Sequence, residues 1–335
     1  MPRSTTNRGA VITGWAVALP DKVVTNVDLE GSLDTSDEWI RERTGIHERR
    51  IGGTTAGLAI EAGQAALDMA GVTGADIDLV IVCTCSPDQQ LPSTASTVQD
   101  QLGVAGGAMD LNAACSGFVY GLVTAHGLLA TGMSRILLVG AETLSRIVDW
   151  DDRNTAILFA DGAGAVVLEA VDGPGQMLGF DLGSDGSGRH VLYADIGGYM
   201  KMDGRETFRR AVRAVVDTVS KTLEQTGVTA DDLAYTIPHQ ANVRIVDSAC
   251  QKLGIPVDKT ANVLYRTGNT SAASIPIALV DALDRGRIAP GDLVLLVGFG
   301  AGMSWASALI RWGGDPADVR PDTTTAIETG TGSAA

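Results

Sequence analysis

The feature that most constrains the fold is an internal repeat. The segment AGVTGADIDLVIV at residues 70–82 resembles TGVTADDLAYTIP at residues 226–238. In each, a helix ends at a glycine, a short acidic turn follows and an apolar strand begins. A second pair, SRILLVGAE and GDLVLLVGFG, repeats at nearly the same spacing, so that the two shifts are 156 and 158 residues. Their agreement predicts a duplicated αβαβ unit.

Composition predicts that the repeat belongs to a large α/β protein. The chain has 335 residues, of which 45% are hydrophobic and 19% charged, so it can bury a sizeable core. Short runs of Val, Ile and Leu alternate with longer Ala-rich stretches, which is typical of a buried parallel or mixed sheet between helices. Residues 313–335 are rich in Gly, Thr, Pro and Asp, so we expect a disordered tail there and a flexible start at residues 1–9.

The charge balance argues against two classes of partner. Forty acidic and 25 basic residues give a net charge of −15 and a pI near 4.6. Such a chain is a poor match for nucleic acid or for an anionic membrane. The sequence also has no run of about 18 uncharged apolar residues, so we expect a cytoplasmic protein.

The four cysteines are too few and too scattered for a disulfide framework. Cys83 and Cys85 fall in the buried-strand pattern LVIVCTCSP and are interpreted as ordinary core residues. A zinc site there would need two more suitably spaced ligands, and no histidine lies near, so we expect no metal.

Cys115 has a different setting, in the stretch DLNAACSGFVYGL, where an apolar strand gives way to an apolar helix. Phe118, Leu122 and later apolar residues follow at helical spacing, which places the thiol in the first turn of a buried helix. The helix N-terminus is expected to lower the pKa of the thiol, and its free N–H groups could hold an oxyanion. A packing role is the alternative, plausible only if Cys115 has no catalytic partner.

Two further motifs supply such partners. The segment IPHQANVRI places His239 just after the strand of the second repeat, and YRTGNTSAAS places Asn269 at a strand-to-helix corner. When the repeat shift is added to its residue number, Cys115 falls within this same segment, so the Cys115 and Asn269 corners are equivalent. The two corners face each other if the halves pack about a pseudo-dyad. Each residue alone is a common turn or capping residue. Together with Cys115 they form a Cys/His/Asn set suited to nucleophilic catalysis.

Two glycine-rich segments and one short helix complete the pattern. FADGAGAVVLEA is interpreted as a tight hairpin turn, because no helix or lysine follows it as in a phosphate loop. GFGAGMSW follows an apolar strand, and its backbone could approach the thiol and supply an oxyanion-hole N–H. DTSDEWIRERTGI opens a helix at Ser36 with Trp39 and Arg43 one turn apart. Trp and Arg can bind an adenine and its phosphates, although a structural Trp is the alternative.

Five motifs together, DTSDEWIRERTGI, AACSGF, FADGAGAVVL, PHQAN and GNTSAAS in chain order, resemble the β-ketoacyl-acyl-carrier-protein synthase III family over residues 10–312. The resemblance implies a thiolase-like fold in which two halves, residues 10–172 and 173–312, build a five-layered αβαβα architecture. It also implies a decarboxylative condensation of an acyl-coenzyme A primer with malonyl-acyl-carrier protein, which initiates type II fatty acid synthesis. The enzyme would be a homodimer without a cofactor.

The resemblance also assigns roles to residues. Cys115 would be acylated, His239 and Asn269 would complete the catalytic set, and the N–H groups of Cys115 and Ala301 would form the oxyanion hole. The residues expected to bind coenzyme A and its pantetheine arm are Trp39, Arg43, Arg153, Gly204, Phe208, Ala241 and Asn242. Phe299 would lie beside the active site. Leu91 stands where many members have an aromatic that closes the primer pocket, which predicts that branched or longer primers are accepted.

An acidic carrier protein needs a basic docking site on this acidic chain. Basic residues gather on the helix after Asp203 and on the segment after His239, and the candidates are Arg209, Arg210, Arg213, Arg244 and Lys252. A solvated helix face without a partner is the alternative.

Other functions are less compatible with these residues. A papain-like hydrolase lacks the duplicated halves, and a non-catalytic binding protein is expected to have lost one of the three catalytic residues. A specialised priming ketosynthase or acyltransferase of polyketide or secondary metabolism stays open, because Leu91 and a short segment at residues 187–200 leave the primer undetermined.

Overall fold

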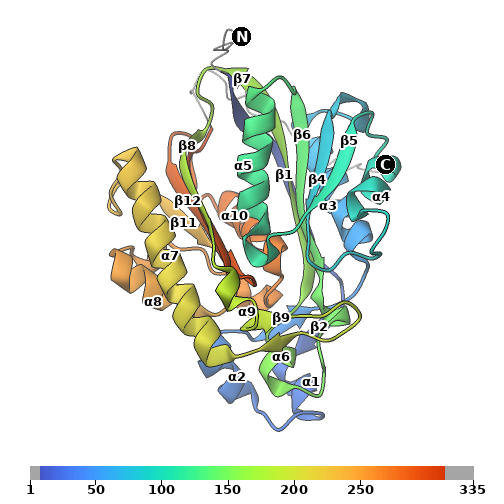
Figure 1. Ribbon diagram of the computed structural model, residues 1–335, viewed down its shortest axis with the longest axis vertical. Helices are drawn as coiled ribbons and strands as arrows, with labels where there is room; N and C mark the ends of the chain where they lie inside the picture. The colour runs from blue at the N-terminus through green and yellow to red at the C-terminus, as the bar shows by residue number, and fades with distance from the viewer. Residues whose placement is uncertain (1–7, 314–335) are drawn as a thin grey trace, which may run out of the picture.

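The computed structural model describes residues 8–313, which form two large sheets between three layers of helices, with smaller elements at one end (Figure 1). The first sheet has the order β1-β7-β6-β4-β5. Its strands are β1 at Arg8–Ala18, β4 at Leu79–Cys83, β5 at Gly107–Leu111, β6 at Arg135–Thr143 and β7 at Asp161–Asp172. Strand β4 is parallel to β5 and β6, whereas β7 is antiparallel to β6 and β1.

The second sheet repeats this arrangement in the order β8-β13-β12-β11. Its strands are β8 at Met177–Ser184, β11 at Tyr235–Pro238, β12 at Leu293–Gly300 and β13 at Ser304–Arg311. They match β1, β4, β6 and β7 in position and direction, since β11 is parallel to β12 and β13 is antiparallel to both of its neighbours. The predicted duplication is confirmed.

The helices form three layers around these sheets. One outer layer holds α3 (Thr55–Ala70) and α4 (Thr94–Gln101), and the other holds α7 (Gly204–Thr226) and α8 (Val243–Leu253). Between the sheets lie α5 (Gly117–Ala130) and α10 (Ser274–Asp284), each of which contacts strands of both sheets (Figure 1). This is the predicted αβαβα architecture.

Sequence pattern explains which helices lie inside. Every residue of α10 from Ser274 to Val280 is buried, because a helix between two sheets must be apolar on all sides. Helix α7 instead buries one stripe, including Val212, Val215 and Val219, and exposes its charged side. The outer helices α3 and α7 both end at a glycine in the left-handed conformation, Gly71 at φ 66° and Gly227 at φ 67°, which accounts for the repeated glycine.

Several of the remaining elements gather at one end of the molecule, at the bottom of Figure 1. They include helices α1 (Asn26–Glu30), α2 (Asp37–Thr44), α6 (Arg153–Ala156) and α9 (Leu264–Thr267). Two short antiparallel pairs join them, β2 (Val23–Thr25) with β3 (Glu48–Arg50) and β9 (Leu192–Tyr193) with β10 (Lys201–Met202). Helix α2 begins after Ser36 as predicted, and the Ser36 hydroxyl accepts the Trp39 N–H at 3.2 Å. Single 3₁₀ turns are η1 (Gly74–Asp76), η3 (Leu144–Arg146), η4 (Gly186–Gly188) and η5 (Val257–Lys259).

Two expectations need correction. The segment FADGAGAVVLEA makes no hairpin turn, because Gly162 and Gly164 lie within strand β7. These glycines let α10 pack closely, since a Cβ on Gly164 would lie 2.8 Å from the Pro276 Cβ.

Strand β1 begins at Arg8, inside the expected flexible start. Residues 1–7 and the tail at 314–335 lie outside the described residues, and the two halves at 10–172 and 173–312 stay a proposal.

Candidate active site

Two equivalent corners meet between the halves. They are the 3₁₀ turns η2 (Ala114–Ser116) and η6 (Ser271–Ala273), which contact each other. Ala114 and Ser271 are the two non-glycine residues with positive φ within residues 8–313, at 46° and 47°. In each corner an asparagine side chain accepts the N–H two residues later, Asn112 from Ala114 at 3.1 Å and Asn269 from Ser271 at 2.9 Å. The predicted equivalence of the two corners is confirmed.

Glycines let each corner lie against a strand of the other half. A Cβ on Gly298 of β12 would lie 2.9 Å from the Ser116 Cα, and one on Gly300 would lie 2.5 Å from the Cys115 nitrogen. In the other half, a Cβ on Gly140 of β6 would lie 2.6 Å from the Ala272 carbonyl oxygen. The expected close approach of the GFGAG backbone to the thiol is therefore present.

Cys115 lies in the 3₁₀ turn that leads into α5 and is 7% exposed. Burial raises the pKa of its thiol to about 12, and the Ser271 hydroxyl opposes this rise. A helix N-terminus contributes up to about 2 kcal/mol, or roughly 1.5 pH units, which is too little to ionise the thiol at neutral pH. The expected lowering of the pKa is wrong for the resting enzyme, because desolvation outweighs the dipole.

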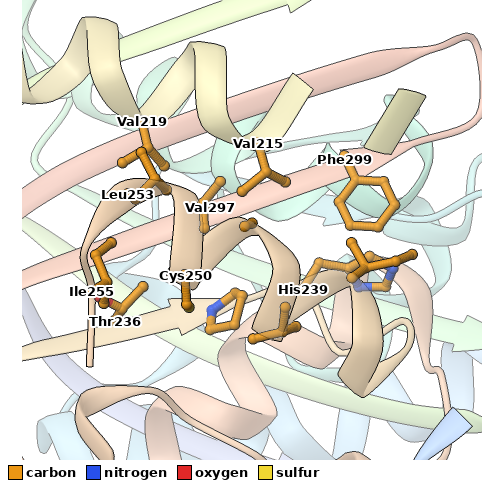
Figure 2. A pocket seen from close by; sticks show the side chains of 13 residues that line it. Val215, Val219, Thr236, His239, Cys250, Leu253, Ile255, Val297 and Phe299 are labelled. Atoms are coloured by element: carbon orange, nitrogen blue, oxygen red, sulfur yellow. The ribbon is translucent and has the colours of Figure 1, made fainter. Parts of the chain in front are cut away.

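His239 follows strand β11 and is 1% exposed. Its Nδ1 lies 2.7 Å from the Ser274 hydroxyl, and its ring meets Phe299 edge-on with centroids 5.3 Å apart. Behind it, a cavity of about 20 Å³ is lined by apolar side chains of α7, α8 and β12, such as Val215, Cys250 and Val297 (Figure 2). Burial in this apolar setting lowers the pKa of His239 to about 3, so the imidazole is neutral.

Asn269 follows α9 and Gly268, and is 4% exposed. Both backbone polar groups of Asn269 are hydrogen-bonded. Its N–H donates to the Leu158 carbonyl and its carbonyl accepts the Ala160 N–H, each at 2.9 Å. Its Oδ1 accepts the Ser271 N–H. This bond fixes the orientation of the amide and directs the Nδ2 donor to the cavity that Asn269 lines.

Two cavities meet at Cys115. One, of about 570 Å³, is lined by Cys115, His239 and Asn269 and extends to Trp39 and Arg43 of α2. The other, of about 580 Å³, continues past Cys115 between Leu144, Tyr193 and Ala301. We name them the entry cavity and the deep cavity. Their arrangement suits a long thioester whose carbonyl reaches Cys115 from one side while its acyl chain extends to the other.

The residues expected to bind coenzyme A lie around the entry cavity. Its walls include Trp39, Arg43, Gly204, Phe208, Ala241 and Asn242. The Arg153 guanidinium lies 4.7 Å from the centre of the Trp39 ring, and that of Arg43 lies 5.3 Å from it. The Asn242 side chain also has a structural task, because it caps α8 and donates to the Arg43 carbonyl at 2.9 Å.

Leu91, expected at the primer pocket, lies on the surface of the chain. It is 83% exposed and lines neither cavity, because the loop after β4 turns its side chain outward. The expectation that Leu91 lines the acyl pocket stays a prediction. Phe299 does lie beside His239 in the entry cavity, and Ala301 lines the deep cavity with Cys115.

The basic residues divide into two groups. Arg209 and Arg210 both pair with Glu206, at 2.7 and 2.6 Å, and Arg210 also pairs with Asp185 at 3.1 Å. Arg244 is exposed, lines the entry cavity and lies over the Phe208 ring at 5.8 Å. Arg213 and Lys252 are exposed on α7 and α8 outside the cavity wall. Lys252 is eight residues beyond Arg244, about 12 Å along the helix.

Sequence reasoning missed four residues of the site. Cys85 is not an ordinary core residue, because it lines the deep cavity with Cys115, although Cys83 is fully buried in the core. Glu142, Ser271 and Ser274 are buried polar residues around Cys115 and His239. Ser271 and Ser274 lie in the quoted motif GNTSAAS, which was the available signal, whereas Glu142 gave none.

The fold and the site define a thiolase-fold condensing enzyme, an acyltransferase. The chain belongs to the 3-oxoacyl-[acyl-carrier-protein] synthase III family, because that family's profile matches residues 109–186 and its C-terminal profile matches residues 223–312. The chain is 50% identical over 307 residues to β-ketoacyl-[acyl-carrier-protein] synthase III 1 of Bacillus anthracis, covering 90% of this chain and 98% of that protein. It is 48% identical over 320 residues to the Agrobacterium fabrum synthase III, covering 90% and 99%.

Solved structures agree. The 3-oxoacyl-[acyl-carrier-protein] synthase III of Aquifex aeolicus VF5 superposes with a TM-score of 0.89 at 44% identity, covering 91% of this chain and all of that one. The priming β-ketosynthase of the R1128 polyketide pathway gives a TM-score of 0.88 at 34% identity, covering 94% of this chain and 99% of that one.

The described helices include none that is long and apolar enough to span a membrane. Residues 8–313 also contain no group of three or more His, Cys, Asp and Glu side chains that could hold a metal ion.

Proposed function

We propose that this enzyme condenses an acyl-coenzyme A primer with malonyl-acyl-carrier protein and so starts type II fatty acid synthesis. The observation that carries the proposal is that Cys115, His239 and Asn269 line one cavity that runs to a Trp/Arg cluster. Cys115 attacks the thioester, and the N–H groups of Cys115 and Ala301 receive the oxyanion. Coenzyme A then leaves an acyl-cysteine.

In the second half-reaction, malonyl-carrier protein loses CO₂ and its enolate attacks the acyl-cysteine. The enolate oxygen carries a negative charge and is stabilised by hydrogen-bond donors. Neutral donors can bind it without first losing a proton themselves. The Nδ2 of Asn269 is such a donor, since its Oδ1 is already bonded. The neutral imidazole of His239 is the other.

The Trp/Arg cluster of Trp39, Arg43 and Arg153 suits coenzyme A. We assign the adenine to the slot between Trp39 and Arg153, where the guanidinium now lies over the ring, and the phosphates to Arg43. The pantetheine arm lies along Gly204, Phe208, Ala241 and Asn242.

For the carrier protein we assign docking to the basic residues of α7 and α8, with Arg244 as the principal contact. Arg244 lies at the entry cavity, and no salt bridge engages it within the described residues. Arg213 and Lys252 extend the surface, whereas Arg209 and Arg210 contribute less because Glu206 offsets their charge.

We further propose a cytoplasmic homodimer that needs no cofactor. The four cysteines are free, which suits a reducing compartment. A dimer would also give Leu91 a role, because a side chain that is 83% exposed in its own chain can reach a primer pocket only in a second copy.

The alternative is a specialised priming enzyme of polyketide metabolism. Identity to the R1128 priming ketosynthase is 34%, against 50% to the Bacillus anthracis synthase III, which favours the fatty acid role. The test is to incubate the enzyme with a panel of acyl-coenzyme A thioesters and malonyl-carrier protein and to follow both proteins by intact mass. We expect acylation of the wild type but not of Cys115→Ala, followed by a β-ketoacyl-carrier product. Acylation of Cys115→Ala, or no condensed product, would contradict the proposal.

A further inference from the structure

The two N–H groups of the proposed oxyanion hole come from segments that are far apart in the chain. The Cys115 N–H belongs to the 3₁₀ turn η2, which we call the nucleophile turn. The Ala301 N–H belongs to the hairpin at residues 300–304, which joins β12 to β13. Two donors stabilise one developing negative charge only if both are held within about 0.5 Å of the productive geometry. The separation of these two segments therefore matters for catalysis.

The hydroxyl of Ser304 connects the hairpin to the nucleophile turn. Ser304 is the first residue of β13, pairs with Gly300 across the hairpin and is buried. Its Oγ lies 3.1 Å from the Ala301 carbonyl oxygen, within the hairpin, and 2.9 Å from the Ala113 carbonyl oxygen, just before the nucleophile turn. One side chain thus contacts both segments that carry the oxyanion-hole N–H groups.

Ser116 adds a second contact from the nucleophile turn itself. It is fully buried at the end of η2, and its Oγ lies 2.7 Å from the Ala113 carbonyl oxygen and 2.9 Å from the Ser304 Oγ. Each hydroxyl has one hydrogen and, within the described residues, two acceptors, so it shares the hydrogen in a three-centre bond. We call Ser116 and Ser304 the serine pair.

The backbone already brings the hairpin against the nucleophile turn. A Cβ on Gly300 would lie 2.5 Å from the Cys115 nitrogen, and Met303 exchanges two backbone hydrogen bonds with Asp185, at 2.8 and 2.9 Å. Close packing limits how near two segments come, whereas hydrogen bonds also fix their direction. The serine pair therefore supplies the orientation of the hairpin relative to the thiol.

The nucleophile turn does not need a serine for its own fold. Ala273 is the counterpart of Ser116 in η6, and its N–H closes that turn on the Thr270 carbonyl at 3.0 Å. The Ser116 N–H closes the nucleophile turn on the Ala113 carbonyl in the same way, at 3.2 Å. Burying a hydroxyl is costly unless it is hydrogen-bonded, and an alanine builds the same turn without that cost. The hydroxyl of Ser116 therefore serves the contact with the hairpin.

We propose that the serine pair sets the separation of the two oxyanion-hole N–H groups, which makes Ser116 and Ser304 positioning residues for both acyl-transfer steps. The inference rests on the proposed function. When the sulfur of Cys115 attacks the acyl-coenzyme A, the carbonyl oxygen becomes the oxyanion between the two N–H groups. When the enolate attacks the acyl-cysteine, the same carbon is bonded to the same sulfur, so its oxygen returns to these donors. Decarboxylation instead places the charge at His239 and Asn269.

The experiment measures the two half-reactions of the full-length enzyme separately, with acetyl-coenzyme A for self-acylation and malonyl-carrier protein for condensation by the acetylated enzyme. For Ser304→Ala we expect both rates at saturating substrate to fall about tenfold. The KM for acetyl-coenzyme A should stay unchanged, because neither serine lines the entry cavity. A hairpin that had only come loose would raise this KM as well, since Gly300 and Met303 do line that cavity.

Three further variants separate the hydroxyl from the rest of the side chain. Ser304→Thr keeps the hydroxyl and should restore the wild-type rates, because Ser304 lines the deep cavity, which has room for a methyl group. Ser116→Ala leaves the direct contact between Ser304 and Ala113 and should lose about threefold. The double variant should lose no more than Ser304→Ala alone, since the two hydroxyls act as a unit.

Ser307→Ala is the matched control, because Ser307 is buried in the same strand but its hydroxyl contacts helix α7, so both rates should be kept. Unchanged self-acylation in Ser304→Ala, or a loss confined to condensation, would overturn the proposal. If Ser304→Ala does not fold, Ser116→Ala carries the test, as Ala273 shows that alanine fits this turn, and an unchanged rate would again overturn it. A wild type that acetyl-coenzyme A never acylates would instead contradict the proposed function.

Discussion

The Ser274 hydroxyl lies 2.7 Å from Nδ1 of His239 and also accepts the Gln240 N–H at 3.2 Å. Within residues 8–313 the Ser274 hydroxyl has no other hydrogen-bond acceptor, so we assign its hydrogen to Nδ1. The proton of the neutral imidazole is then on Nε2, and the ring presents a donor to the entry cavity.

Ser274→Ala should therefore slow condensation, because the imidazole is no longer held in the tautomer that donates from Nε2. We expect a loss of about tenfold, the equivalent of one hydrogen bond of roughly 1.4 kcal/mol. Single-turnover acylation should be unchanged. Ser307→Ala, a buried serine of the same half that bonds Thr218 and Thr222, is the control. Equal loss in the two half-reactions would contradict the tautomer assignment.

His239→Ala and Asn269→Ala should each impair decarboxylation and condensation more than self-acylation. Each removes one donor to the enolate, which by comparison with oxyanion-hole deletions costs about 2.7–4 kcal/mol, or 10²- to 10³-fold in rate. Release of CO₂ and intact-mass acylation measure the two steps separately. If both steps fall together, the division of roles is wrong.

His239 should also make the fold sensitive to acid. Its pKa is about 3 when folded and about 6.5 when unfolded, so below pH 6.5 the unfolded chain binds the extra proton. The free energy of unfolding should therefore fall by roughly 1.4 kcal/mol per pH unit from this group between pH 6.5 and 3. Urea denaturation of the wild type and His239→Gln at pH 7, 5 and 4 checks this. The variant should lose less stability on acidification, and parallel losses would show that His239 is not responsible.

Arg244→Glu should raise the KM for malonyl-carrier protein about three- to tenfold at low salt and leave self-acylation unchanged. Charges at the rim of an interface mainly change the rate at which the two proteins associate. Arg209→Glu should have a smaller effect, since Arg209 is already paired with Glu206 at 2.7 Å. Kinetics of both half-reactions at low and moderate salt decide this. A carrier KM that is insensitive to Arg244→Glu and to salt would place docking elsewhere.

Leu91→Phe should narrow the primer pocket of the partner subunit and shift the preference from branched and longer primers toward acetyl. Competition between acyl-coenzyme A thioesters, read by intact mass, measures the preference. Val257→Phe, another exposed apolar residue at 59%, lines neither cavity and should change nothing. If Leu91→Phe leaves the primer preference unchanged, Leu91 does not line a primer pocket, either in its own chain or in a partner subunit.

The sequence by itself determined the duplicated fold, the equivalence of the Cys115 and Asn269 corners, and the helix at Ser36. These features depend on local patterns, such as the glycine that ends each outer helix and the apolar spacing of the inner ones. Periodicity and capping act over a few residues, so they are readable along the chain.

Only the tertiary structure decided the protonation of Cys115 and the place of Glu142. Desolvation depends on every element around the thiol, and it outweighs the helix dipole that the local sequence predicts. Glu142, Cys85 and Ser271 come from segments that are more than 50 residues apart and meet only because β6 and the η6 corner pack together. Likewise, Gly162 and Gly164 suggested a turn, but their pairing with β6, and that of Gly164 with β1, makes them part of a strand.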